Sequence, residues 1–278
     1  MRGDNAKKRF GSSETASAED LEAADLFTQH KHSIFVGFFN GLKVYFHGPA
    51  GMVLTAGARS GKLRDVLAYN IITGTCLQNV VMLDPKREGQ SISANQTADS
   101  KFVACWAPAA EDGLRDRIAP LPTFVLRNPN LVAHIKVLWE NLISSSGSGN
   151  ARYFEGLARV YGEALSLALC ELNGKLNLPD LFDVITMLPG GGERWLDFAF
   201  HMKKSRFPQV VEAEAAIAAA RSDSSGGFNG IVGELTRCLA CLTDGNLRAS
   251  VSPPFTMSLD ALLDPDQRWQ VYLSPPVE

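Results

Sequence analysis

Short apolar runs dominate the two ends of the chain, and helical periodicity dominates its middle. Residues 32–39 and 42–46 are apolar runs separated by Asn40-Gly41, a pair typical of a two-residue β-hairpin turn. Further short apolar runs predict strands at residues 52–54, 79–84, 101–106 and 269–273. A continuous apolar run such as residues 79–84 is typical of a parallel strand that is covered on both faces.

Residues 150–249 have helical periodicity almost throughout. Asn150 is predicted to cap a helix over residues 151–172. Other helices are predicted at residues 17–28, 65–72, 131–143, 178–188, 193–204, 209–221 and 228–242. The final strand needs sheet partners, and those precede the helices, so the order predicts an all-helical unit inserted into an α/β domain. The predicted limits are 1–17 for a flexible tail, 18–145 and 250–278 for the sheet domain, and 146–249 for the insertion.

The run of small residues after the predicted strand 52–54 is the main candidate for chemistry. It contains Gly57 and ends in Ser60-Gly61-Lys62, immediately before a predicted helix. Strand, small-residue loop with Gly-Lys, then helix is the layout of a phosphate-binding loop, in which backbone N–H groups and a lysine surround a phosphate. The common pattern wants Gly where Ala56 stands and Ser or Thr where Leu63 stands. A strand–turn–helix in which Gly61 merely permits a tight turn is the alternative.

Asp84 ends the predicted strand 79–84, at the edge of a parallel sheet where ligands bind in α/β proteins. This position predicts a carboxylate that holds Mg²⁺ or its water molecules. Two structural roles remain open for Asp84: capping the following segment, or pairing with Lys86.

Composition sets few further limits. The chain has 278 residues, 45% of them hydrophobic and 21% charged, with a net charge of −3, which excludes general polyanion binding but not a local basic surface. No apolar run approaches the roughly 18 residues of a membrane helix, and the N-terminus lacks the apolar core of a signal peptide. Five scattered cysteines favour a reducing compartment. Cys238 and Cys241 are interpreted as buried thiols on a helix rather than as a metal or redox pair, and apart from the magnesium role of Asp84 no metal site is predicted.

Several motifs in the same order resemble the type IV secretion coupling ATPases, the TraG-like conjugation proteins. Residues 56–62 are similar to that family's loop, which often reads A-P-T-R-S-G-K-G. Residues 81–88 resemble its V-x-L-D-P-K-G-E strand end, and residues 271–276 resemble its V-Y-L-V-P-P strand. Residues 34–37 and 228–231 are similar to two further family segments. The resemblance covers about residues 18–278.

The resemblance implies a RecA-like P-loop domain with a mostly parallel sheet and an inserted all-α domain. It implies binding of ATP with Mg²⁺ and catalytic roles for Lys62 and Asp84. The implied nucleotide contacts are Ala56, Gly57, Ala58, Arg59, Ser60, Gly61, Lys62 and Leu63. It further implies hexamers within the secretion apparatus, at the cytoplasmic face of the inner membrane, that recruit relaxase–DNA complexes or effector proteins.

Departures from the family pattern keep hydrolysis open. Leu63 cannot offer Mg²⁺ a hydroxyl, Arg87 replaces a glycine, and the acidic pair expected after residues 271–273 is not in the sequence. A truncated or degenerate copy is therefore expected to bind nucleotide more readily than it hydrolyses it. The alternatives are an adaptor of the same fold that acts through protein binding, and an unrelated P-loop kinase.

Overall fold

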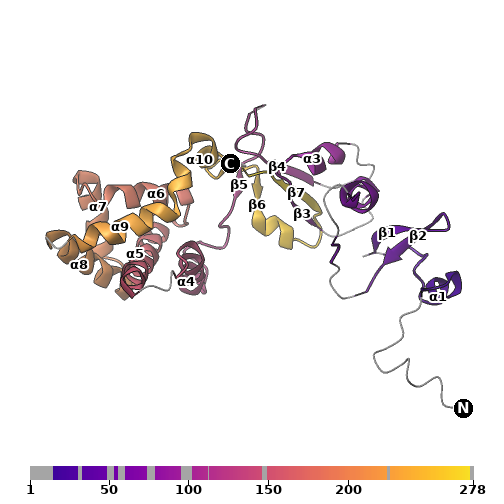
Figure 1. Cartoon of the computed structure of the whole chain (residues 1–278). Coiled ribbons are helices and arrows are strands. Elements are labelled where there is room, and N and C mark those ends of the chain that lie inside the picture. Colours follow the sequence, from indigo (N-terminus) through magenta and orange to yellow (C-terminus); the bar gives the residue numbers. More distant parts are fainter. Residues whose placement is uncertain are drawn as a thin grey trace, which may run out of the picture. The chain divides into compact units, whose positions relative to one another are not determined.

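The computed structural model of the chain describes residues 15–30, 33–48, 53–55, 60–73, 79–94, 102–111, 113–145, 149–223 and 226–275 (Figure 1). By its internal contacts the chain divides into two compact units. The first comprises residues 1–103 and 266–272, and the second comprises residues 104–265 and 273–278. This division differs from the limits predicted from the sequence, because residues 104–145 and 250–265 group with the helices.

The first unit begins with a short helix and the predicted hairpin. Helix α1 (Ala18–Ala23) starts at a capping box in which Ser17 and Asp20 bind each other's backbone N–H groups. Strands β1 (Ile34–Phe39) and β2 (Leu42–Phe46) pair in antiparallel fashion. Asn40 and Gly41 both have positive φ, 48° and 79°, which is the geometry of a type I′ turn. The hairpin prediction is confirmed.

The last strand of the chain lies in the middle of the main sheet, between strands that precede the helices (Figure 1). The sheet order is β3 (Val80–Leu83), β7 (Trp269–Leu273) and β4 (Phe102–Trp106). The Phe102 N–H binds the Arg268 carbonyl at one end of the β4–β7 pair, and the Ser274 N–H binds the Trp106 carbonyl at the other. This register makes β4 and β7 parallel, as the sequence predicted for an α/β sheet.

Two predictions about strands are wrong. Residues 53–55 form no strand, and Val53 and Leu54 are 88% and 46% exposed, so the described part of the run before the loop is not buried. Strand β3 is not covered on both faces. Helix α3 (Glu88–Ser93) approaches Met82 so closely at Gly89 that an added Cβ would lie 2.5 Å from the sulfur, whereas Val81 on the opposite face is exposed.

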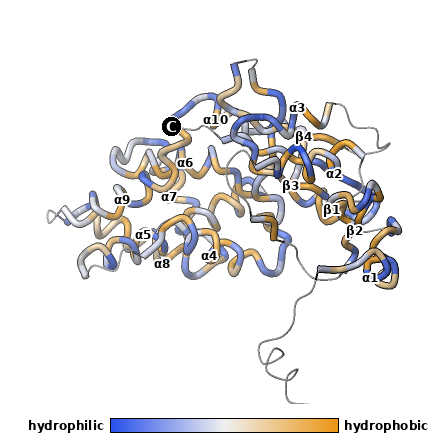
Figure 2. The backbone as a smooth tube through the Cα atoms, turned by 45° about the vertical axis from the view of Figure 1, so that its right-hand side comes forward, coloured by the Kyte–Doolittle hydropathy of each residue, from blue (hydrophilic) through white to orange (hydrophobic). Residues whose placement is uncertain are grey.

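The second unit is built from helices around one apolar core. Figure 2 shows hydrophobic and hydrophilic residues alternating along these helices, as expected where one face packs inward. The helices are α4 (Leu131–Leu142), α5 (Gly149–Asn173), α6 (Leu178–Met187), α7 (Glu193–Lys203), α8 (Pro208–Ser222), α9 (Gly227–Cys238) and α10 (Gly245–Ser250), with short 3-10 turns η2 (Ala240–Thr243) and η3 (Leu259–Leu263). A two-residue parallel pair, β5 (Ile118–Ala119) with β6 (Met257–Ser258), completes it.

The contact between α4 and α5 explains why α4 belongs to the helical unit. Trp139 of α4 is fully buried, and its indole N–H donates to the Ser166 hydroxyl of α5 at 2.9 Å. A Cβ at Gly162 would lie 2.4 Å from the indole ring, so the glycine admits the tryptophan. Helix α5 begins at Gly149. Asn150 therefore lies inside the helix, and the prediction that Asn150 caps it is wrong.

Within the part of the chain that the structure describes, none of the helices combines the length and the apolarity needed to cross a bilayer.

Candidate functional site

Four of the predicted nucleotide contacts lie at the start of the helix that follows the predicted phosphate loop: Ser60, Gly61, Lys62 and Leu63. Gly61 precedes the helix with φ of 87°, and Lys62 is the first residue of a π-helical segment, η1 (Lys62–Leu67), which continues as α2 (Ala68–Thr73). The Asp65 N–H closes the first turn on the Gly61 carbonyl at 2.7 Å. The other predicted contacts, Ala56, Gly57, Ala58 and Arg59, lie outside the described residues.

The turn at Gly61 has two reasons to be a glycine. A φ of 87° is left-handed, which costs other residues about 1–2 kcal/mol. An added Cβ would also lie 2.2 Å from the carboxylate of Asp65. That carboxylate accepts from the Arg64 Nε at 2.5 Å, which lowers the pKa of Asp65 and offsets a negative charge beside the helix start.

The hairpin docks on this helix through one buried amide side chain. Asn70 of α2 is 7% exposed, and it accepts the Phe35 N–H at 2.9 Å and donates to the Phe35 carbonyl at 2.8 Å. The amide thus replaces a strand partner at the point where β1 bulges, between Phe35 and Gly37. The Phe35 and Tyr69 rings pack alongside, tilted by 33° with centroids 3.9 Å apart.

The central strand bonds to the next residue of α2, Ile71. Gln270 of β7 is fully buried, and its side-chain amide donates to the Ile71 carbonyl at 3.1 Å. Tyr272 donates to the Gln270 side-chain oxygen at 3.1 Å. Sequence reasoning singled out neither Asn70 nor Gln270, although a lone amide inside an apolar run is the signal that could have found Gln270.

Asp84 lies at the end of β3, as predicted, and is 3% exposed. Its two carboxylate oxygens accept the backbone N–H groups of Glu88 at 3.0 Å and Gln90 at 2.9 Å, both at the start of α3. This geometry is the capping role that the sequence left open for Asp84. A metal ion at this carboxylate would have to compete with these two N–H donors for the oxygen lone pairs.

A pocket with several charged side chains lies between α5, α6 and α7 of the helical unit. It has a volume of about 430 Å³, and its lining includes Asp180, Asp183, Asp197, Arg194 and His201. Arg248 donates to Asp183 at 2.6 Å. The Nε2 atom of His201 is buried, with no hydrogen-bond partner among the described residues. The lining of this acidic pocket combines three carboxylates with a larger share of apolar side chains.

Cys238 supports the interpretation of buried thiols. Burial raises the pKa of its thiol to about 11, and the Sγ donates to the Leu235 carbonyl at 3.1 Å. A thiol with this pKa is protonated at neutral pH and is a poor metal ligand or nucleophile. Cys241 is exposed.

Comparison with known proteins identifies a family over nearly the whole chain. A family model described as type IV secretory system conjugative DNA transfer matches residues 5–273. A search of curated proteins found no match.

Proposed function

The chain belongs to the type IV secretory system conjugative DNA transfer family, and from this premise we propose that it is a nucleotide-binding motor module that recruits DNA or protein substrates for export. The observation that carries the proposal is the turn at Gly61. A left-handed glycine there leads directly into a helix whose first residue is Lys62. The start of a helix directs backbone N–H groups and a partial positive charge toward an anion.

Each residue of this turn has a distinct role in the proposal. Ser60 and Gly61 supply backbone N–H groups to the phosphates, and Lys62 neutralises the outer phosphates. Ala56, Gly57, Ala58 and Arg59 would complete the loop. Leu63 is half-buried and packs at the first turn. The ligand is ATP, and the paired charges of Arg64 and Asp65 keep the carboxylate from repelling it.

Magnesium contributes little in this proposal. Leu63 has no hydroxyl for the ion, and both oxygens of Asp84 already accept backbone N–H groups. The family match supports three further parts of the proposal: a RecA-like fold, hexamer formation and a position at the cytoplasmic face of the inner membrane. Recruitment of relaxase–DNA complexes or effector proteins is proposed on the same basis. The acidic pocket of the helical unit offers a place where a basic segment of such a substrate would bind.

Leu63 and Asp84 also favour a second candidate function. An adaptor that keeps the fold without ATP turnover would act through its helical unit alone. In this candidate Leu63 packs the helix, Asp84 caps α3, and neither has a catalytic role.

Titration of ATP into the purified chain tests the proposal. Lys62→Ala is expected to weaken ATP affinity at least about tenfold, because a charge-assisted contact to phosphate contributes about 1.5–3 kcal/mol. Lys86→Ala removes an exposed lysine from the same unit and is expected to leave the affinity unchanged. Equal affinity in wild type and Lys62→Ala would eliminate nucleotide binding at this loop.

Turnover separates the two candidates. The adaptor predicts no ATP hydrolysis above the rate of Lys62→Ala, with or without Mg²⁺. The motor predicts hydrolysis that Lys62→Ala abolishes. Asp84→Asn refines the test, since a capping role predicts a lower thermal midpoint with an unchanged magnesium response, whereas a metal-binding role predicts a weaker response.

A further inference from the structure

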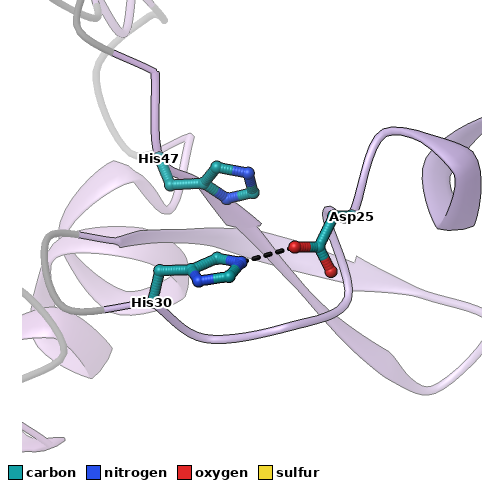
Figure 3. A group of neighbouring side chains, drawn as sticks. All are labelled: Asp25, His30 and His47. Carbon is teal, nitrogen blue, oxygen red and sulfur yellow. Dashed lines mark hydrogen bonds and ion pairs between the residues drawn. The ribbon is translucent and has the colours of Figure 1, made fainter.

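Two histidines and an aspartate meet beside the hairpin, outside the nucleotide loop (Figure 3). Asp25 follows α1, His30 lies in the loop before β1, and His47 directly follows β2. One potential ligand atom from each residue lies within 4.8 Å of the other two. His30 Nε2 is 2.5 Å from Asp25 Oδ2, and the two imidazole rings are 4.6 Å apart, edge to face.

The backbone around this cluster is fixed by its own hydrogen bonds. The Tyr45 N–H of β2 donates to the Leu26 carbonyl at 2.8 Å, which joins the segment carrying Asp25 to the hairpin. The His30 N–H donates to the hydroxyl of the fully buried Ser33 at 2.7 Å. These bonds hold the three side chains on one side of the hairpin without any ion.

His47 shows that the cluster is not satisfied by its own hydrogen bonds. Its Nδ1 atom is buried, yet it has no hydrogen-bond partner among the described residues. Figure 3 shows the His47 ring facing the pair formed by His30 and Asp25. A buried imidazole nitrogen without a partner is costly unless a donor or a cation takes its lone pair.

We propose that Asp25, His30 and His47 bind one divalent transition-metal ion of the zinc class, with water in the fourth position. Imidazole nitrogen and carboxylate oxygen are ligands that such ions prefer. Metal–ligand distances of about 2.0–2.2 Å require the ligand atoms to lie roughly 3.3 Å apart in a tetrahedral site. The side chains of His30 and Asp25 are 46% and 54% exposed, so they have the freedom to move to this spacing, which lengthens their own 2.5 Å contact, and to leave the ion open to solvent.

The bound ion would join α1 to both outer ends of the hairpin. It would also fix the chain at His47, upstream of the segment that leads into the phosphate loop. The proposal does not depend on nucleotide binding, because none of the three residues belongs to that loop.

Titration of Co²⁺ into the full chain, after treatment with a chelator, tests the site. We expect one ion per chain, visible absorption typical of nitrogen and oxygen ligands, and displacement by Zn²⁺. His30→Ala and His47→Gln are each expected to weaken binding by at least about tenfold, since even outer-shell partners of metal ligands act on that scale. His30 is exposed, so His30→Ala tests the site even if His47→Gln lowers the content of folded protein seen by circular dichroism.

Two matched variants exclude other sources of binding. His201→Ala and the double variant Cys238→Ser/Cys241→Ser remove ligand-type residues of the helical unit and are expected to bind Co²⁺ as wild type does. Binding that survives both His30→Ala and His47→Gln would overturn the proposal. So would an absorption band from thiolate ligands that the double variant abolishes, or the absence of binding to the wild-type chain.

Discussion

The two units of this protein differ in how much of their apolar surface they bury. The helical unit has a continuous core that runs from Leu131 to Val251 and includes the fully buried Trp139 and Leu165. The first unit carries the proposed phosphate contacts, and among its described residues the buried apolar side chains are Phe35, Tyr45, Ile71, Val271 and Tyr272. Apolar residues of its sheet such as Leu83 are 70% exposed.

The two units are therefore stabilised mainly by different kinds of interaction. The helical unit is held together by burial, which is non-directional and tolerant of detail. The described part of the first unit relies on specific polar contacts, such as the amides of Asn70 and Gln270. A lightly buried region has a low free energy of local opening, and a ligand that binds only its folded form stabilises it by mass action.

Trp139→Ala gives the largest expected effect. Removing a fully buried tryptophan costs about 3–5 kcal/mol of unfolding free energy, and it leaves Ser166 without the indole donor. Urea denaturation followed by circular dichroism measures this loss in the helical signal. ATP affinity, measured under folding conditions, should not change, because the contacts of Trp139 lie within the helical unit. A loss of affinity equal to that of Lys62→Ala would break the comparison.

Asn70→Ala tests the polar clamp of the first unit, which is the pair of hydrogen bonds between the Asn70 side chain and the Phe35 backbone. It leaves the buried N–H and carbonyl of Phe35 without their partner, at a cost of about 1–3 kcal/mol. Asn141→Ala is the matched control, since Asn141 is exposed and bonds only within its own helix. Thermal unfolding should show a lower midpoint for Asn70→Ala and almost none of that change for Asn141→Ala. Equal midpoints would show that the clamp is dispensable.

Gly61→Ala and Gly156→Ala are expected to change the stability of the two units in opposite directions. The left-handed φ and the contact with Asp65 are expected to make alanine unfavourable there by about 1–2 kcal/mol, and to weaken ATP binding. Gly156→Ala lies inside α5, where an added Cβ meets nothing within 4 Å. The free energy of unfolding of Gly156→Ala is expected to be about 0.5–1 kcal/mol higher than that of wild type, because alanine favours the helix over glycine. Two alanines with effects of the same sign would contradict this account of the turn.

The sequence predicted those features that local patterns determine. The hairpin followed from Asn40-Gly41, and most helices in the second unit followed from apolar periodicity. The place of β7 in the sheet followed from the order of elements. The membership of the conjugative DNA transfer family followed from several weak motifs in order.

Predictions were wrong or missing where the structure depends on elements that are distant in the sequence. Val53 and Leu54 look like a strand but are exposed, because apolar character alone cannot show whether a neighbouring element covers a run. The position of Asp84 at the strand end was predicted, and its bonds to the start of α3 are the capping role that the sequence left open beside the magnesium role. Asp25, His30 and His47 are separated along the chain, so no local motif shows that their ligand atoms lie close together. The ATP contacts themselves stay a prediction.

Amide hydrogen exchange with and without ATP tests the central claim, that the turn at Gly61 and Lys62 binds the phosphates. The account predicts that ATP slows exchange in residues 60–73 and leaves residues 149–173 unchanged. It predicts no such protection in Lys62→Ala, while Lys86→Ala behaves as wild type. Protection confined to the helical unit, or no ATP-dependent change in residues 60–73 of the wild-type chain, would contradict it.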